Sequence, residues 1–578
     1  MHPAPIAAVL AALPPPEACG AAAKTLKGWL RDAGESEVAA AAWSAELDSQ
    51  LLRHAATVAK AKKKALGRLT AAEMLLPKAG SAAHESLALL CPGLLACSAA
   101  AVRQRWLLVA RLNVEAEPLL SLAHSGWSAM AHTLGARLCA LRALVFPEVK
   151  ERAWKKALPG GPTDQGVVKD GVAVRLNRYE AEEARERLAG GGADMASHFK
   201  GTLFYQLFAQ LNADDPLKLR RRDRGFKVRF VGEAADDYGG PYREAVTDVC
   251  AELQAASSAL LLLCPNGKHG LGDNRSAFVP RPAAASAAEL RQFHFLGKLM
   301  GCALLQSQMV LDLELAPHVW KRLAGITALD AADLSAFDAG QASSLASLRH
   351  IEREGIDESL FGDLFFETFE ATLSDDSSVE LFEGGAAEPV TFASRGRFCD
   401  LVAAARLGEG AAACEAMRAG MSEVVGPAAG RLLSLMSGGE LQLLVCGEAD
   451  VDVAALKAHT RYGAGVSETQ KHIKLFWAVL KEFTPEQRRL FLKFIWGRNR
   501  LPLTEDDWGE QHMRIHTLET RRPDGHFPVA HTCFFSIEWP QYSSQQVAFD
   551  KLLYAINNCV AIDADNTAEA RSNVAAAR

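Results

Sequence analysis

The sequence predicts an α+β protein, in which a mostly helical N-terminal region precedes a region where helices alternate with short strands. Residues 1–158 are rich in Ala and Leu, which favour helix. From about Val172 onward, segments with alternating apolar residues appear between segments with a helical period. The chain has 578 residues, and a single core rarely organises more than about 250–300. We therefore expect at least two or three compact units.

The N-terminal region is predicted to be a bundle of helices. Residues 37–69 contain few helix breakers, and Trp43, Leu47, Leu51 and Leu52 recur at helical spacing on one face. The Pro- and Gly-rich segment Pro159–Gly166 is typical of a linker or long loop. We interpret residues 1–158 as a separate helical region and a candidate for binding substrates or partners.

The C-terminal region is predicted to hold a small α/β unit. Segment 224–232 alternates Phe226, Val228 and Phe230 with charged residues, which indicates a strand. A first helix is expected from Ile473, Phe476, Trp477 and Leu480, which share one face. A second begins at Thr484, with Pro485 at its first position and Gln487 completing a capping box, and Gly497 can end it. Segments 513–518 and 532–537 are expected to be strands. Ser543 or Ser544 would cap a last helix, whose apolar face is Phe549, Leu552, Leu553 and Ile556.

Composition narrows the classes of function. The formal charge of −6 and the pI near 6.3 argue against a nucleic-acid binder, which usually carries a basic excess. No apolar run reaches the roughly 20 residues that span a bilayer. The twelve cysteines show neither a C-x-x-C pair nor zinc-finger spacing, so free thiols in a reducing compartment are expected, the cytoplasm with the nucleus also open. Neither a metal site nor a nucleotide-binding motif is found, and no cofactor is expected.

Cys533 is the cysteine whose neighbours suggest chemistry. It follows a loop rich in turn-forming residues and therefore expected to be exposed. His531, Arg521 and Arg522 could increase the thiolate fraction, which is the nucleophilic form. The alternative is a cysteine on an edge strand, packed among aromatic residues. Local features alone leave both interpretations open.

The residues around Cys533 resemble the active-site segment of HECT ubiquitin ligases. The segment PVAHTCFFSIEWPQYSS (528–544) has the family's order of Pro, His-Thr-Cys-Phe and Pro-x-Tyr. TCFF and YAINNCVAID are most similar to the giant HERC-type HECT ligases, which also carry RCC1-like repeats; no such repeats occur in this chain. Further blocks resemble the family in the same order, namely 226–253, 293–304, 440–452, 460–477 and 483–502.

The resemblance implies a bilobal HECT domain. Its helical N-lobe, with small sheets, would span residues 172–446 and include an E2-binding subdomain at about 310–410. An α/β C-lobe would span 450–566, with 567–578 as a tail. The hinge would lie at Gly447, Glu448 and Ala449, although a simple loop glycine after a helix is the alternative. Gly447 suits a hinge because glycine tolerates large changes of φ and ψ.

The resemblance also implies a reaction. Cys533 would accept ubiquitin from a ubiquitin-charged E2 as a thioester and pass it to lysines of protein substrates. His531 and Thr532 are candidates for orienting or stabilising the reacting groups, with packing as the alternative. Phe398 would contact the E2, as would Leu345, Leu364 and Phe366, unless these residues belong to the core. Two other functions stay open: a catalytically weak HECT-fold scaffold, and a ligase for a ubiquitin-like modifier.

Two further features are interpreted as structural. The basic run 218–229 is expected to be a solvated face leading into a strand. Gly239, Gly240 and Arg243 are expected to form a tight turn followed by a helix whose Arg pairs locally.

Overall fold

The computed structural model describes most of the chain, which divides into two compact units. The smaller, which we call the helical unit, contains residues 1–161, 324–326 and 426–437; the larger contains the rest. No helix among the described residues is long and apolar enough to cross a membrane. The predicted α+β class is confirmed, since helices predominate and the sheets are small. The described residues are 44–122, 133–158, 172–189, 199–213, 216–221, 225–232, 240–306, 309–448, 450–497, 500–502, 508 and 511–558.

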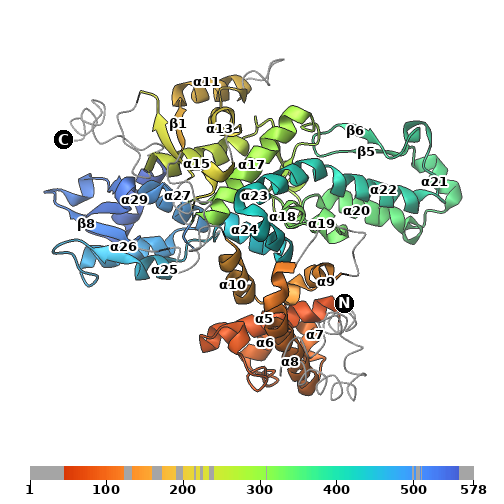
Figure 1. The fold of residues 1–578 in the computed structure, drawn as a ribbon, viewed down its shortest axis with the longest axis horizontal. Coiled ribbons are helices and arrows are strands. Elements are labelled where there is room, and N and C mark those ends of the chain that lie inside the picture. Colours follow the sequence, from red (N-terminus) through yellow and green to blue (C-terminus); the bar gives the residue numbers. More distant parts are fainter. Residues whose placement is uncertain are drawn as a thin grey trace. The chain divides into compact units, whose positions relative to one another are not determined.

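The regular elements in the described part of the N-terminal region are all helices (Figure 1). The first, α5 (Ala45–Lys62), begins where Ser44 accepts a hydrogen bond from the amide of Leu47, and it buries Leu51 completely. Trp43, the first member of the predicted stripe, and the predicted linker 159–166 lie outside the described residues. The remaining elements are η2 (Leu66–Arg68), α6 (Ala82–Leu90), α7 (Pro92–Leu95), α8 (Ala99–Ala116), η3 (Glu117–Leu122), α9 (Leu134–Ala140), η5 (Arg142–Leu144) and α10 (Pro147–Ala157).

The interior of the helical unit contains satisfied polar groups as well as apolar ones. Arg105 on α8 donates from Nε and Nη2 to both carboxylate oxygens of Asp48 on α5, at 2.8 and 2.6 Å. Both side chains are about 95% buried, so each charge depends on the other. Trp106 stacks on Phe146 with ring centroids 5.3 Å apart. These contacts fix α5, α8 and the start of α10 against one another.

We call residues 172–446 the N-lobe, except for the two short segments that pack in the helical unit. Its first sheet pairs β1 (Val172–Leu176) with β2 (Phe226–Phe230) in parallel. Phe226, Val228 and Phe230 are buried and the residues between them exposed, which confirms the predicted strand. Helix α15 (Gly240–Leu253) packs on β2. The other elements as far as the centre of the lobe are α11 (Arg178–Ala189), α13 (Leu203–Leu211), α14 (Pro216–Leu219), β3 (Leu261–Leu263), α16 (Pro265–His269), β4 (Phe278–Pro280), α17 (Ala287–Leu305) and α18 (Pro317–Leu323).

Two long helices of the N-lobe touch through glycines. Gly297 on α17 lies so close to α23 (Ala411–Leu432) that an added Cβ would stand 1.9 Å from the carbonyl oxygen of Met417. On the other side, a Cβ on Gly420 would stand 2.0 Å from the carbonyl oxygen of His294. Only glycine permits this backbone approach. Helix α23 is broken at Gly426, whose φ of 84° is not helical, and the boundary between the two units falls there.

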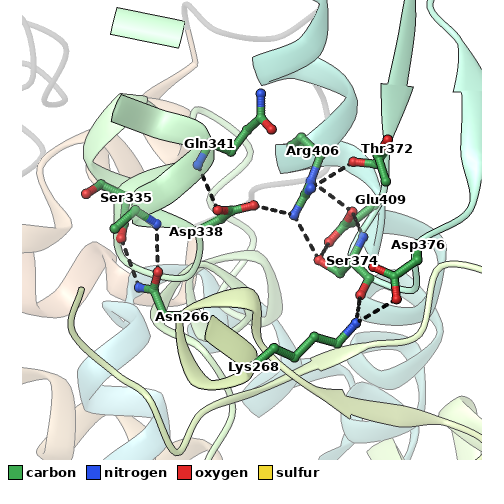
Figure 2. A network of polar contacts seen from close by, with 11 residues as sticks. Asn266, Lys268, Ser335, Asp338, Gln341, Thr372, Ser374, Asp376, Arg406 and Glu409 are labelled. Carbon is green, nitrogen blue, oxygen red and sulfur yellow. Dashed lines mark hydrogen bonds and ion pairs between the residues drawn. The ribbon is translucent and has the colours of Figure 1, made fainter. Parts of the chain in front are cut away.

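The distal part of the N-lobe is built from α19 (Ala331–Ser335), α20 (Ala339–Arg349), α21 (Glu358–Leu364), α22 (Arg395–Gly408) and the hairpin of β5 (Glu370–Thr372) with β6 (Ser378–Glu380). Figure 2 shows the polar network at its base, with Arg406 in the centre. The Arg406 guanidinium lies 2.8 Å from Asp338 and 3.3 Å from Glu409. It also donates to the Ser374 hydroxyl at 3.0 Å. This buried cation therefore joins α20, α22 and the β5–β6 hairpin.

Residues 450–558, which we call the C-lobe, form a small α/β structure. Its sheet has the order β7-β8-β10-β9, with the first two pairs parallel and the last antiparallel. Its core is apolar and strongly aromatic, and Phe476, Phe491 and Trp539 are completely buried in it. The elements are α25 (Val453–Ala458), β7 (Thr460–Tyr462), α26 (Lys471–Glu482), α27 (Pro485–Trp496), β8 (Met513–Leu518), β9 (Val529–His531), β10 (Ser536–Pro540) and α29 (Gln545–Asn558).

Most predicted details of the C-lobe are confirmed. The capping box of Thr484 and Gln487 is present at the start of α27, and Gly497 ends the helix with a φ of 69°. Ser544 caps α29 by accepting from the amide of Val547 at 3.3 Å. The predicted strand 532–537 is wrong in its first half. Thr532–Phe534 form a 3-10 turn, η10, and the strand begins at Ser536.

Candidate active site

Cys533 lies in the middle of η10, the turn that joins the antiparallel strands β9 and β10. The register pairs His531 with Ser536, so the turn closes directly on the last pair of the ladder. The neighbours of Cys533 differ in exposure: Thr532 is buried, while 69% of Phe534 is exposed. The turn therefore lies at the surface of the C-lobe and is anchored on its Thr532 side.

Phe535 ends the turn in a conformation that is unusual for its residue type. Its φ of 47° lies in the left-handed region, which a bulky side chain seldom occupies. The surroundings hold it there: the ring stacks on Trp496 at 3.9 Å between centroids and 7° between planes. Its carbonyl also accepts a hydrogen bond from the amide of Arg514 on β8 at 2.9 Å. Packing of the C-lobe thus fixes the backbone that directly follows the turn of Cys533.

His531 has an acidic partner. Its Nε2 lies 3.1 Å from Oε1 of Glu538. Glu538 stands two residues beyond Ser536, so the pair is diagonal across the strands and on one face of the sheet. Both side chains are only partly exposed. A carboxylate at this distance selects the ring orientation and tautomer of the imidazole.

Two features of Thr532 distinguish it from an ordinary packing residue. Its side chain is 8% exposed, and its Oγ1 is buried with no hydrogen-bond partner among the described residues. Its carbonyl oxygen accepts from Nη2 of Arg243, on α15 of the N-lobe, at 3.2 Å. An unpartnered buried hydroxyl next to a candidate nucleophile is an unused donor and acceptor.

Sequence reasoning missed the role of Arg243. The expectation of a purely local partner is wrong, because Nε donates to the carbonyl of Trp496 at 3.2 Å while Nη2 reaches Thr532. Arg521 and Arg522, the cations expected near Cys533, are exposed on the loop between β8 and β9. The available signal was an arginine on the otherwise apolar face of the segment GPYREAV. Charge on such a face implies a buried partner.

The candidate hinge is only partly described, because Ala449 lies outside the described residues. Gly447 ends α24 (Gly438–Cys446) with a φ of 71°. A Cβ there would lie 3.3 Å from the carbonyl oxygen of Leu501 and 3.4 Å from Cβ of Arg500. Glu448 is exposed. Glycine at 447 thus suits the left-handed conformation and the tight space there, which fits both a hinge and a simple helix end.

Two arginines of the C-lobe contact the N-lobe near this point. Arg500 donates from Nε to Asp312 at 3.0 Å and from Nη1 to the carbonyl of Gly447 at 3.2 Å. Arg489 pairs with Glu314 at 2.9 Å. Together with Arg243, these two side chains make polar contacts between the two lobes.

The predicted E2-contact residues fall into two classes. Phe398 on α22 and Leu345 on α20 are each 7% exposed, and the Phe398 ring packs edge-on against Phe369 at 5.7 Å. Their burial favours the core alternative. Leu364 and Phe366 are 61% and 79% exposed. These two side chains are therefore open to a partner.

No group of three or more His, Cys, Asp or Glu side chains in the described part of the chain is arranged to hold a metal ion. Nine cysteines of that part are free thiols. Burial raises the pKa of Cys302, Cys414 and Cys446 to about 12 in each case. These three thiols therefore stay protonated and unreactive at neutral pH.

Comparison with known proteins defines the class. Residues 247–563 match the HECT-domain (ubiquitin-transferase) family model. The human E3 ubiquitin-protein ligase HERC2 is 35% identical over 437 residues, which are 74% of this chain and 8% of the relative. The human probable E3 ubiquitin-protein ligase HECTD4 is 32% identical over 361 residues, 57% of this chain and 9% of the relative. The E3 ubiquitin-protein ligase pub3 of fission yeast (Schizosaccharomyces pombe) is 28% identical over 361 residues, which are 62% of this chain and 43% of the relative.

The chain belongs to the HECT family. The turn with Cys533, the α/β C-lobe and most of the N-lobe lie inside the matched region. The described part of the helical unit before residue 158 lies outside it. The chain spans less than a tenth of the length of HERC2 and of HECTD4.

Proposed function

We propose that this chain is an E3 ubiquitin-protein ligase that carries ubiquitin as a thioester on Cys533. The observation that supports this most directly is the position of Cys533. Inside a matched HECT domain, it occupies a surface turn whose flanks are held by Phe535 and Thr532. The buried cysteines, whose pKa is raised, are poor alternatives.

The first step is an exchange of thioesters. The thiolate of Cys533 attacks the carbonyl carbon that joins the ubiquitin C-terminus to the E2 cysteine, and the E2 thiolate leaves. One thioester bond forms as another breaks, so the step needs positioning more than a driving force. The hydroxyl of Thr532 is a candidate donor to the oxygen that becomes negative in the tetrahedral intermediate.

The second step forms an isopeptide bond. The neutral amine of a substrate lysine attacks the thioester, loses a proton and releases the Cys533 thiolate. The His531–Glu538 pair supplies an imidazole held in one orientation two residues from the nucleophile. This imidazole is our candidate for accepting the amine's proton, with Glu538 stabilising the imidazolium that results.

The proposed E2 surface is the exposed apolar patch on and after α21. Leu364 and Phe366 are its anchors, and Leu360 adds a third apolar side chain that is 46% exposed. Phe398 on α22 and Leu345 on α20 are buried and would support the subdomain from inside. Exposed apolar anchors are the usual hot spots of such interfaces.

The proposed hinge at Gly447 lets Cys533 meet two different partners, first the E2 and then the substrate. A left-handed glycine beside a few polar contacts between the lobes suits such a change. We further propose that residues 1–158 bind substrates or partners. The free thiols fit a reducing compartment, so we place the protein in the cytoplasm, with the nucleus also open.

Thioester formation tests the proposal. The protein is mixed with E1, ATP, ubiquitin and a panel of E2s, and run on a gel with and without DTT. We expect a DTT-sensitive ubiquitin adduct that is lost in Cys533→Ala. The matched control is Cys97→Ser, which removes a half-buried thiol of the helical unit and should keep the adduct.

The alternatives have distinct outcomes in the same assay. Absence of an adduct with every E2 would support the scaffold function. An adduct formed only with a ubiquitin-like modifier would assign that modifier instead. An adduct that persists in Cys533→Ala would exclude Cys533 as the carrier.

A further inference from the structure

Arg243 connects the two lobes at the turn that carries Cys533. Its guanidinium donates to the carbonyl of Trp496 from Nε and to the carbonyl of Thr532 from Nη2, both at 3.2 Å. The side chain is 8% exposed. One cation of the N-lobe thus contacts both the end of α27 and the residue before the candidate nucleophile.

The next turn of α15 makes a similar contact. The Thr247 hydroxyl lies 3.1 Å from the carbonyl of Gly497 and 3.1 Å from that of Arg243, so it can donate to either. Trp496, whose carbonyl binds Arg243, is the residue on which Phe535 stacks. The face of α15 therefore contacts the end of α27 and the carbonyl of η10, two segments that packing within the C-lobe already joins.

We propose that Arg243 is an interlobe positioning residue that docks the turn of Cys533 on α15, and that this docked arrangement serves the transfer of ubiquitin to lysine. The inference rests on the proposed thioester function of Cys533. It adds a residue of the N-lobe that is remote from Cys533 in sequence. Arg243 would favour the position of Cys533 that suits transfer to lysine over the position that suits thioester formation.

The second step is assigned because the two partners differ in size. Helix α15 covers one side of the turn through Thr532 and Trp496. An E2 is a folded protein and needs a broad approach to Cys533. A lysine side chain is narrow and needs only a channel. Docking also fixes the carbonyl next to the nucleophile, and small errors of position slow bond formation strongly.

Arginine is suited to this contact in a way that lysine is not. Its planar group presents several N–H donors in fixed directions, so it holds two carbonyls at once. An ammonium on a flexible stem can reach one of them. Arg243→Lys should therefore retain part of the docking of the Cys533 turn on α15.

Single-turnover kinetics test the inference on the whole chain. Thioester formation is timed after mixing with charged E2, and its discharge is timed separately with a lysine-bearing peptide. We expect Arg243→Ala to slow discharge about tenfold, which corresponds to about 1.4 kcal/mol, without slowing thioester formation. Arg243→Lys should lie between Arg243→Ala and the wild type.

A matched control exists in the N-lobe. Arg220 also donates to two backbone carbonyls, those of Val424 and Glu423 at 2.8 and 2.9 Å, but both belong to its own lobe. Arg220→Ala should leave the ratio of the two rates unchanged. If Arg243→Ala does not fold, Thr247→Val gives a weaker test. This substitution should again slow discharge and leave the rate of thioester formation unchanged.

Two results would overturn the inference: unchanged discharge in Arg243→Ala, or equal slowing of both steps, which indicates a general structural defect. A wild-type protein that forms no thioester with any E2 would instead remove the proposed function itself. Failure of the docking and failure of the ligase are thus distinguished.

Discussion

The two lobes are stabilised by different means. The interior of the C-lobe is a cluster of apolar and aromatic side chains around Trp539 and Phe476. The N-lobe also buries ionisable side chains, including Arg406 between two carboxylates and Glu252 near the end of α15. The contacts between the lobes include a third kind, in which arginine and threonine side chains bind carbonyls and carboxylates. The hinge motion that we propose would break these polar contacts and leave the apolar core of the C-lobe intact.

The largest expected effect is the loss of stability when a central side chain of the C-lobe core is removed. Trp539 is fully buried, packs edge-on against Phe476 at 5.1 Å and donates to the carbonyl of His472 at 3.1 Å. Trp539→Ala should lower the free energy of unfolding by about 3–5 kcal/mol. Denaturant unfolding measures this. Tyr554→Ala, at a side chain that is 55% exposed, is the control, and equal losses in both would contradict the account.

The N-lobe should respond to pH at Glu252. Burial raises the pKa of this carboxyl from 4.5 to about 7, against the effect of the amides of Leu203 and Phe204. The folded state holds a proton that the unfolded state has lost between these values. The contribution of Glu252 to the free energy of unfolding is therefore most favourable below pH 4.5. It becomes less favourable as the pH rises through 7, by about 3 kcal/mol in total.

The difference between wild type and Glu252→Gln isolates this effect. The glutamine can still accept from the amide of Phe204, which Glu252 does at 3.0 Å. The gain in stability of Glu252→Gln over wild type should grow between pH 5 and 8, as followed by denaturant unfolding. Glu180→Gln, at an exposed position, should show no such trend. A gain that is the same at every pH would refute the assignment.

A smaller effect is expected at the proposed E2 surface. Phe366→Asp places a charge where an exposed apolar anchor is needed, so thioester formation should slow about tenfold, or about 1.4 kcal/mol. Leu89→Asp makes the same change at another exposed side chain, 83% exposed on α6. Rates of adduct formation that do not differ between the two variants would move the E2 surface elsewhere.

The smallest effect is expected between the lobes. The Arg489–Glu314 pair is partly exposed, with side chains 24% and 29% accessible. Arg489→Ala should cost about 0.2–1 kcal/mol, and less at high salt. The readout is the melting temperature at two salt concentrations. A loss as large as that of Trp539→Ala would mean that the lobes fold as one body.

The sequence predicts best those structural features that depend on residues close together in the chain. The start and end of α27 depend on Thr484, Gln487 and Gly497, which act within their own turns. The turn at Cys533 was predicted as strand because nothing local requires Phe535 to be left-handed; its stacking on the distant Trp496 does. Arg243 was misread for the same reason, since its partners lie in the other lobe. The exposed fractions likewise show that Phe366 is open to a partner and that Phe398 is buried, a difference that the sequence does not predict.

We propose that Cys533 alone among the twelve cysteines carries ubiquitin. A ubiquitin with a C-terminal alkyne forms a stable bond with an attacking thiol, and tryptic digestion with mass spectrometry then locates that bond. We expect the modification on the peptide of residues 522–551, in which Cys533 is the only cysteine, and no modification in Cys533→Ala. Modification of any other cysteine peptide in the folded protein would contradict it.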